Sequence, residues 1–476
     1  MSPGATAITT VTGIMHPDRP AQVCTYRRHS IRASIGLLVA SLVTTCAFAQ
    51  DDDDVSRRPE FGIRLGTGQT DNVARDSTSE VRTDFDVFGL RFNARSDTQR
   101  VTGALFGDVE LRQYPSNAVL RDDEEVIGSA DGILSVHIVP ERFTWHFQQN
   151  FGQTRTNLFA PVGPNNRERA AVSSTGPQLV LPAGRRNTLE MGGRVSDRTF
   201  EDSAQLDSRV TAAELRLARS VGVTTEVSIS LAQSEYEYET DDQTYEFEVL
   251  FLTYAKELAT GLVQLDLGGG EINIGSDSES TAVGRFQWDR DVGSRSRLGV
   301  WAGHELTDAG DLFRLGGVSG VRQNSLSGLE NVLSLNDNRL RSIVLSRSPL
   351  QRSILGTQLA VAGALTTFAV SVAFSDDSFE REDTLDNSAT TIQVSAGREF
   401  ARSWRGEVNV VVQRQDFQDP PGDITRDNDD TLGGLAAIRQ IGRRMSVSIA
   451  YERFRRDSVF DVRHENQYLV SLAYDF

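Results

Sequence analysis

Charged side chains at every second position are the residues of this sequence best suited to chemistry. One series runs Asp108, Glu110 and Arg112, and another pairs Arg405 with Glu407. A β-strand points alternate side chains to opposite faces, so each series places its charges on one face. Such a face suits water, ions and small hydrophilic solutes, and its excess of acids favours cations. The predicted lining residues of a lumen are Asp108, Glu110, Arg112, Glu214, Arg216, Glu226, Glu246, Glu248, Arg405 and Glu407.

A second candidate site is the irregular segment from about 308 to 349. It lacks clean strand alternation and carries Arg339, Arg341 and Arg347. One interpretation is a constriction loop that folds into a lumen and lines it with arginine. The alternatives are a loop on the outer surface, or one further strand over Leu340–Ser348.

Residues for catalysis or metal binding form no local motif. The histidines are His16, His29, His137, His146, His304 and His464, and none stands at catalytic spacing from serine, aspartate or another histidine. We therefore expect no enzyme, no cofactor and no metal site. A hydrolytic site assembled from distant strands would place His304 or His146 beside a serine and a carboxylate.

Strands must position these side chains, because period-2 alternation recurs along the chain. Val227, Ile229 and Leu231, for example, alternate with Ser228 and Ser230. Short turns are predicted near Asp97, Pro140, Ala183, Val221, Leu258, Gly293, Ala364, Ala401 and Ile441. Longer connections are predicted at Asp71–Glu80, Pro115–Glu125, Arg155–Glu168, Glu201–Leu206, Ile274–Glu279 and Gln418–Asp430. This alternation predicts an all-β, transmembrane up-and-down antiparallel barrel over 60–476, with an even strand number of about 16–20, most simply 20.

The two ends of the sequence predict export. Arg27, Arg28 and Arg32 precede the apolar run 35–43, and Ala47-Phe48-Ala49 offers a cleavage site. We expect a signal peptide over 1–49 and an acidic tail over 50–59. A twin-arginine signal and a lipoprotein box ending at Cys46 are the alternatives. At the other end, a strand places Tyr468, Val470, Leu472, Tyr474 and Phe476 on one face.

That last strand, ending on Phe476, resembles the C-terminal assembly signal of Gram-negative outer-membrane β-barrels. With its signal peptide and alternating strands, the chain resembles these barrels over its whole mature length. It implies partners in outer-membrane lipid and the barrel-insertion machinery. The segment 141–150, Glu-Arg-Phe-Thr-Trp-His-Phe-Gln-Gln-Asn, is more narrowly similar to the porin-type barrels found with exopolysaccharide and exosortase systems. That similarity implies passage or assembly of cell-surface polysaccharide, and no catalytic residues.

Composition excludes several classes of protein. Both cysteines, Cys24 and Cys46, lie in the expected signal, so neither a disulfide scaffold nor a thiolate metal site is expected. A formal net charge of −17 argues against nucleic-acid binding. A mean hydropathy of −0.33 excludes a bundle of transmembrane helices but suits a barrel, in which only alternate residues touch lipid.

The sequence therefore predicts a porin-like channel for small hydrophilic solutes or ions, mildly cation-preferring, in the outer membrane. The alternative is an envelope-biogenesis barrel for exopolysaccharide export or assembly. Further partners would be periplasmic export proteins or other copies of the chain.

Overall fold

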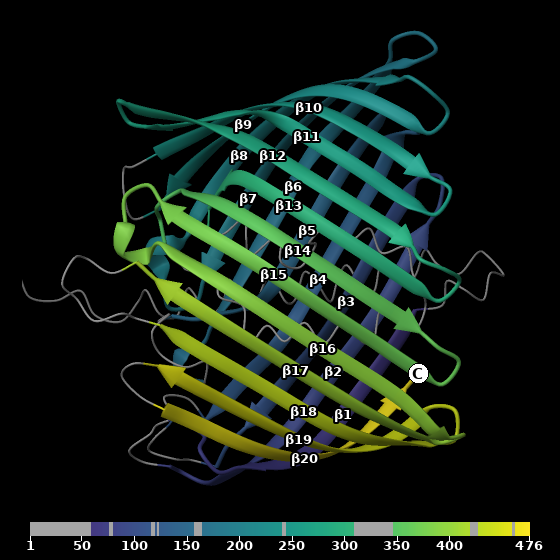
Figure 1. The fold of residues 1–476 in the computed structure, drawn as a ribbon, viewed down its shortest axis with the longest axis vertical. Helices are drawn as coiled ribbons and strands as arrows, with labels where there is room; N and C mark the ends of the chain where they lie inside the picture. Colours follow the sequence, from purple (N-terminus) through teal and green to yellow (C-terminus); the bar gives the residue numbers. More distant parts are fainter. Residues whose placement is uncertain are drawn as a thin grey trace, which may run out of the picture.

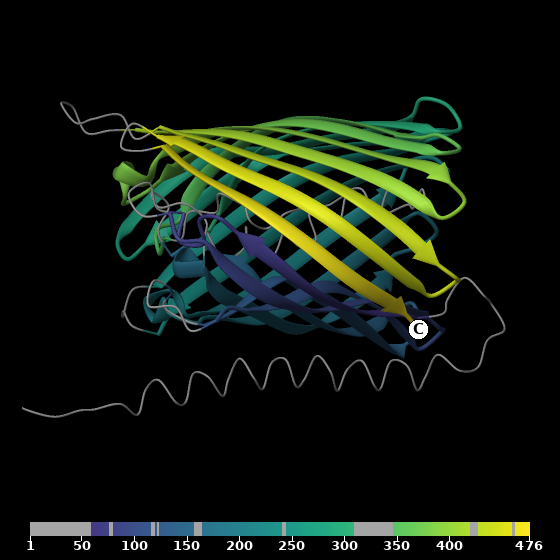
Figure 2. The same cartoon turned by 90° about the horizontal axis from the view of Figure 1, so that it is seen from below.

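The computed structural model describes residues 59–75, 80–115, 120, 123–156, 164–239, 244–308, 346–418, 427–458 and 462–476. These residues form one antiparallel sheet of twenty strands that closes on itself, because β1 (Glu60–Thr70) pairs with β20 (Val462–Asp475). Figures 1 and 2 show the resulting barrel from two sides. The all-β, twenty-strand prediction is confirmed.

The strands follow one another around the wall in chain order, and the described parts of the connections contain three single-turn 3₁₀ helices. The other strands are β2 (Thr83–Asp97), β3 (Val101–Gln113), β4 (Glu124–Val139), β5 (Phe143–Thr154), β6 (Glu168–Pro182), β7 (Asn187–Phe200), β8 (Ser208–Ser220), β9 (Thr225–Tyr238), β10 (Thr244–Leu258), β11 (Gly261–Ile274), β12 (Asp277–Asp291), β13 (Ser296–Thr307), β14 (Leu350–Ala362), β15 (Thr366–Phe379), β16 (Asn387–Ala401), β17 (Trp404–Phe417), β18 (Asn428–Ile441) and β19 (Met445–Ser458). The 3₁₀ helices are η3 (Pro164–Asn166), η4 (Ala204–Leu206) and η6 (Asp383–Leu385).

The two ends of the barrel differ in their connections. All nine predicted short turns join strands at one end, which also holds the C-terminus and lies at the right in Figure 1. The remaining connections join strands at the opposite end, called the loop end below. One predicted longer connection, Ile274–Glu279, is wrong. β11 and β12 are joined there by two residues, Gly275 and Ser276, because Gly275 adopts a φ of 65° that suits a tight hairpin turn.

The outward face has an apolar band beside the short turns. Large apolar side chains such as Leu231, Leu252, Leu435 and Ile449 are 51–62% exposed there. Water would make such exposure unfavourable, whereas lipid makes it favourable. Three tryptophans lie close to the short turns on the same face, as expected for an interfacial girdle: Trp145, Trp288 and Trp404. Among the described residues, no helix is both long and apolar enough to cross a membrane.

Beyond the apolar band, toward the loop end, the outward face carries charged side chains. Two of the predicted lining residues lie there instead of in the lumen. Register places Glu246 and Glu248 on the same face of β10 as the exposed Leu250 and Leu252. The prediction of a lumen position is therefore wrong for both glutamates. The physical reason is that the strands extend past the apolar band at the loop end, where an outward carboxylate meets water.

The wall is irregular where β12 meets β13. Their pairing stops at Gly284↔His304, although β12 continues to Asp277 and β13 to Thr307. The register of β13 would point Leu306 outward. Instead, Leu306 packs on a cluster of inward-facing side chains that includes Val210 and Ile272. The ends of β13 and β14 thus tilt inside β11 and β12. Gly270 permits this close approach, since a Cβ there would lie 2.6 Å from Leu306 Cδ1.

Several predicted segments lie outside the described residues. These are the signal peptide, nearly all of the acidic tail, and 309–345 of the irregular segment with Arg339, Arg341 and most of the possible strand Leu340–Ser348. The described residues 346–349 are not a strand.

Candidate functional site

The inner wall of the barrel is the candidate functional site. Register places eight of the ten predicted lining residues on it: Asp108, Glu110, Arg112, Glu214, Arg216, Glu226, Arg405 and Glu407. The two exceptions are the outward glutamates of β10.

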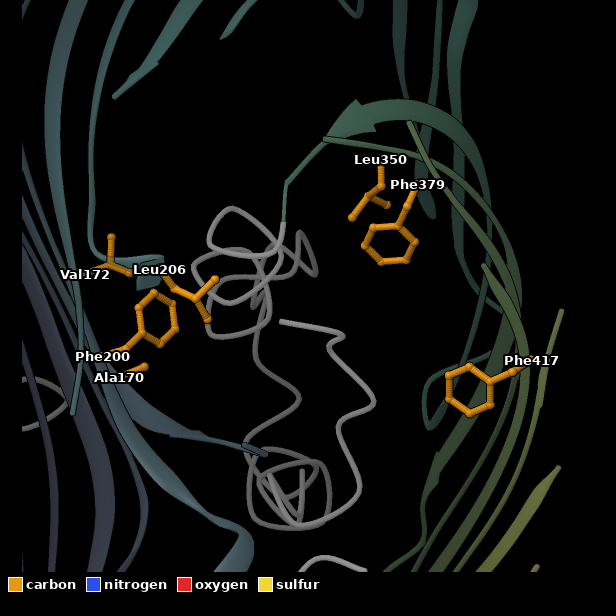
Figure 3. Packing of buried hydrophobic residues seen from close by; sticks show 7 residues of the cluster. All are labelled: Ala170, Val172, Phe200, Leu206, Leu350, Phe379 and Phe417. Atoms are coloured by element: carbon orange, nitrogen blue, oxygen red, sulfur yellow. The ribbon is translucent and has the colours of Figure 1, made fainter. Parts of the chain in front are cut away.

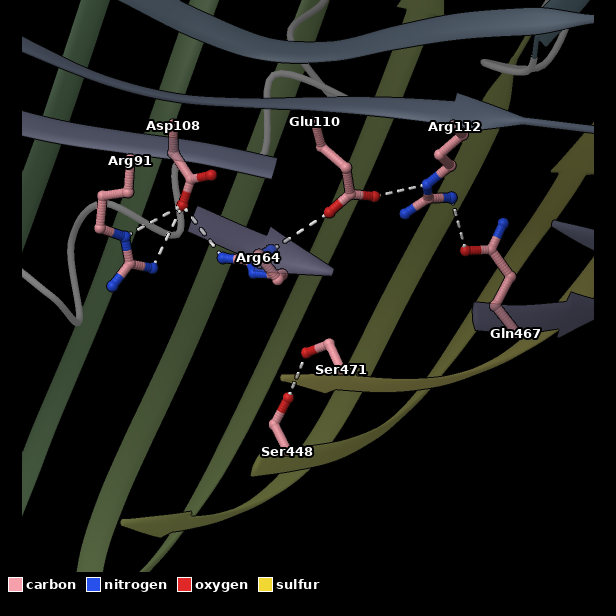
Figure 4. Close-up of polar contacts among 8 residues, drawn as sticks. All are labelled: Arg64, Arg91, Asp108, Glu110, Arg112, Ser448, Gln467 and Ser471. Carbon is pink, nitrogen blue, oxygen red and sulfur yellow. Dashed lines mark hydrogen bonds and ion pairs between the residues drawn. The ribbon is translucent and has the colours of Figure 1, made fainter. Parts of the chain in front are cut away.

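Ion pairs neutralise much of this wall. Arg64 on β1 reaches over β2 to Asp108 and Glu110 on β3, at 3.3 and 3.1 Å (Figure 4). Gly89 lies between them on the inner face of β2, and a Cβ there would be only 3.1 Å from Arg64 Cβ. Arg112 pairs with Glu110 at 2.6 Å and donates to Gln467 on β20. A continuous charged network therefore crosses the closing seam of the barrel.

The same kind of pairing occurs farther around the inner wall, on β8 and on β17. Arg216 contacts Glu190 at 3.1 Å and also pairs with Glu226, and Arg405 contacts Glu407 at 2.9 Å. Glu214 and Asp289 have no arginine partner among the residues described. These carboxylates give the inner wall its excess of negative charge.

Two histidines contact serine, but neither completes a triad within the described structure. His146 Nδ1 lies 2.8 Å from Ser135 Oγ, and its Nε2 lies 2.9 Å from the amide oxygen of Gln178. His304 Nδ1 lies 2.8 Å from Ser353 Oγ, and its other nitrogen faces Thr281. An amide or a hydroxyl thus occupies the place of the expected carboxylate. The described residues also contain no group of three or more metal ligands.

The inner wall changes character toward the loop end, where apolar side chains face the lumen. Val172, Phe200, Leu350 and Phe379 are at most 3% exposed. Figure 3 shows them, with Ala170, Leu206 and Phe417, on two facing walls. Apolar side chains are this well buried only where water is excluded from them, so the lumen is narrowed at this level.

Both ends of the 308–349 segment bind to the inner wall there. Asp308 follows β13 and forms a buried ion pair with Arg198 on β7, across five intervening strands. At the other end, Tyr245 on β10 donates to the backbone carbonyl of Arg347 at 2.9 Å. The inward tilt of β13 and β14 explains both contacts. The ends of this segment therefore lie inside the lumen.

Sequence reasoning missed a group of loop-end arginines that also lie inside the barrel. Arg75, from the β1–β2 connection, pairs with Glu465 on β20 at 2.5 Å and stacks over Phe454. Arg155 follows β5 yet lies 3.7 Å from Asp430 on β18, on the far side of the lumen. No local pattern marks these residues, because each partner is hundreds of positions away in the chain.

The overlap of β12 with β14 contains a pair of carboxyl groups joined by an amide. Gln351 Nε2 donates to Glu279 at 3.2 Å and to Glu380 at 2.9 Å. Partial burial raises the pKa of Glu380 to about 7, and the hydrogen bond and charge of Glu279 add to the rise. Glu380 therefore holds its proton at mildly acidic pH.

We expect this pair to make barrel stability depend on pH. Because the pKa of Glu380 is higher in the folded state, its contribution is complete below about pH 4.5 and is lost as pH rises through about 7. After allowance for solvent screening, we expect a loss on the order of 1 kcal/mol in the free energy of unfolding between pH 5 and pH 8. Glu380→Gln should flatten this profile, and Glu235→Gln on the outward face should not. Equal profiles in all three proteins would contradict the raised pKa of Glu380.

Comparison with known proteins gives a coarse likeness only. No family model matches the chain, and no curated protein matches it. Among solved structures, the siderophore receptor PirA from Pseudomonas aeruginosa aligns over 88% of this chain and 80% of its own, at 10% identity and a TM-score of 0.40. The FrpB iron transporter from Neisseria meningitidis aligns over 88% and 81%, at 9% identity and a TM-score of 0.41. We draw no function from similarity at this level, and these matches do not support the finer resemblance to exopolysaccharide-associated barrels.

Proposed function

We propose that this protein is an outer-membrane channel for small hydrophilic solutes or ions, narrowed at its loop end. The observation that carries the proposal is the contrast between its two faces. The outward face has an apolar band that suits lipid, and the inward face carries polar and paired charged side chains. A closed barrel of twenty strands leaves room for a lumen between such walls.

The proposal extends to a mild preference for cations. Carboxylates without an arginine partner, such as Glu214 and Asp289, would concentrate cations in the wide part of the lumen. The narrow part lies where apolar and arginine side chains approach from facing walls. Location in the outer membrane, export by a cleaved signal and insertion by the barrel-assembly machinery belong to the same proposal.

Single-channel recording in planar bilayers tests it. The protein should insert and give stable open steps, and a KCl gradient should give a reversal potential on the cation side. Glu214→Gln combined with Asp289→Asn should move that potential toward zero. A protein that inserts but never conducts would contradict an open channel, and one that stays soluble without detergent would contradict the membrane barrel.

A further inference from the structure

The guanidinium group of Arg155 is buried without a hydrogen bond. Its side chain is 3% exposed, and Nε, Nη1 and Nη2 all lack a hydrogen-bond partner. The nearest carboxylate oxygen, Oδ2 of Asp430, is 3.7 Å away, which is too far for a hydrogen bond. A guanidinium cation has five N–H donors, and burying them unmet is strongly unfavourable.

Asp430 does not accept a hydrogen bond from Arg155, because its carboxylate oxygens already accept from Arg456. Arg456 Nε lies 2.6 Å from Oδ1 of Asp430 and Nη2 lies 2.5 Å from Oδ2, so both oxygens are taken in a bidentate pair. The aspartate is therefore directed at β19 rather than at the far wall from which Arg155 comes.

Further positive charges surround Arg155. Burial lowers the pKa of Arg155 to about 9, Asp430 partly offsets this, and the charges of Arg456, Arg167 and Arg75 lower it further. Of these neighbours, Arg167 pairs with Glu125, and Arg75 with Glu465. Each of these three neighbours thus has a carboxylate of its own, whereas the guanidinium of Arg155 has no hydrogen bond.

We propose that Arg155, with Arg456 beside it, forms a binding site for an oxyanion, the carboxylate or phosphate group of a small solute, at the loop end of the lumen. Two oxygens of such a group match the planar fork of a guanidinium. One negative charge there would compensate the charge of Arg155 and accept from its unmet donors. The site lies on a different level from the acidic part of the inner wall, so it retains an anion without setting the ion preference of the wide lumen.

Isothermal titration of the folded full-length protein in detergent, with inorganic phosphate and with citrate, tests the site. We expect saturable binding of at least one probe, and the stronger of the two identifies the preferred oxyanion. Arg155→Gln should weaken that binding by about tenfold or more, since it removes a buried charge-assisted contact. The matched control is Arg455→Gln, which changes an outward arginine on the same strand as Arg456 and should bind as the unchanged protein does.

A second variant separates binding from folding. Arg155→Lys keeps the charge but loses the planar fork, so it should bind with intermediate affinity. Heat-modifiable migration on gels confirms that each variant is folded. Failure of both probes to bind the folded protein, or equal binding by Arg155→Gln, would overturn the site. This result is independent of channel conductance, so the two proposals can fail separately.

Discussion

Ile449→Arg should abolish efficient insertion of the barrel into bilayers. Ile449 lies in the middle of β19, is 62% exposed, and pairs with Ala437 and with Val470, which is 49% exposed. If lipid contacts this face, an arginine there costs about 2–4 kcal/mol. That is a large share of the stability of a typical domain. Folding yield into lipid vesicles, read as heat-modifiable migration, measures the effect.

The adjacent residue provides the matched control. Ala450 points to the lumen, where the side chain of Arg64 and other charged groups already lie. Ala450→Arg should therefore fold nearly as well as the unchanged protein. The natural Arg453 lies four residues farther along the face of Ile449, which places the edge of the apolar band between them. Equal folding of both variants would show that water, not lipid, contacts the outward face.

The strand number and the short turns could be predicted from the sequence because they depend on local patterns. Alternation reports the two faces of each strand, and nine breaks in alternation located nine turns. The failure at Ile274–Glu279 has the same origin. Polar residues there resemble a loop, but they occupy the outer, hydrated end of a hairpin that Gly275 turns tightly.

Alternation could not decide which face looks inward where both faces are polar or both are apolar. At the start of β10, Glu246 and Glu248 alternate with Tyr245 and Phe247. Inside a lipid band the apolar pair would face outward, and that assumption placed the glutamates in the lumen. Above the band the preference reverses, because Tyr245 and Phe247 pack in a buried aromatic cluster inside the barrel.

A constriction loop at 308–349 is one interpretation of the sequence, but the contacts of the narrow part could not be predicted, because they join connections to distant strands. Arg75 meets Glu465 over a sequence separation of 390. The one available signal is the glycine at 270, which is useful only once the ends of β13 and β14 are known to tilt inward. Alternation therefore predicts which face a strand residue occupies, but it does not predict the contacts of side chains in the connections.

Arg198→Met should destabilise the loop end of the barrel and widen the channel. Arg198 and Asp308 form an ion pair with side chains 2% and 1% exposed, and Arg198 also stacks over Tyr236. Removing one partner of a buried ion pair costs about 3–5 kcal/mol. Because this pair holds Asp308, the first residue of the 308–349 segment, to the inner wall, its attachment should loosen. We expect larger and noisier single-channel conductance, together with a lower free energy of unfolding.

The double variant Arg198→Met with Asp308→Leu distinguishes lost attachment from the loss of a single charge. Replacing both partners by apolar groups of similar size removes both charges of the pair, so most of the lost stability should return. Packing of Leu306 on the cluster that contains Tyr236 and Phe247 would still hold the end of β13 to the inner wall. Conductance should then return toward that of the unchanged protein. If the double variant recovers its stability but keeps the larger conductance, the ion pair itself holds the segment in place; if neither single nor double variant changes conductance, the segment does not narrow the lumen.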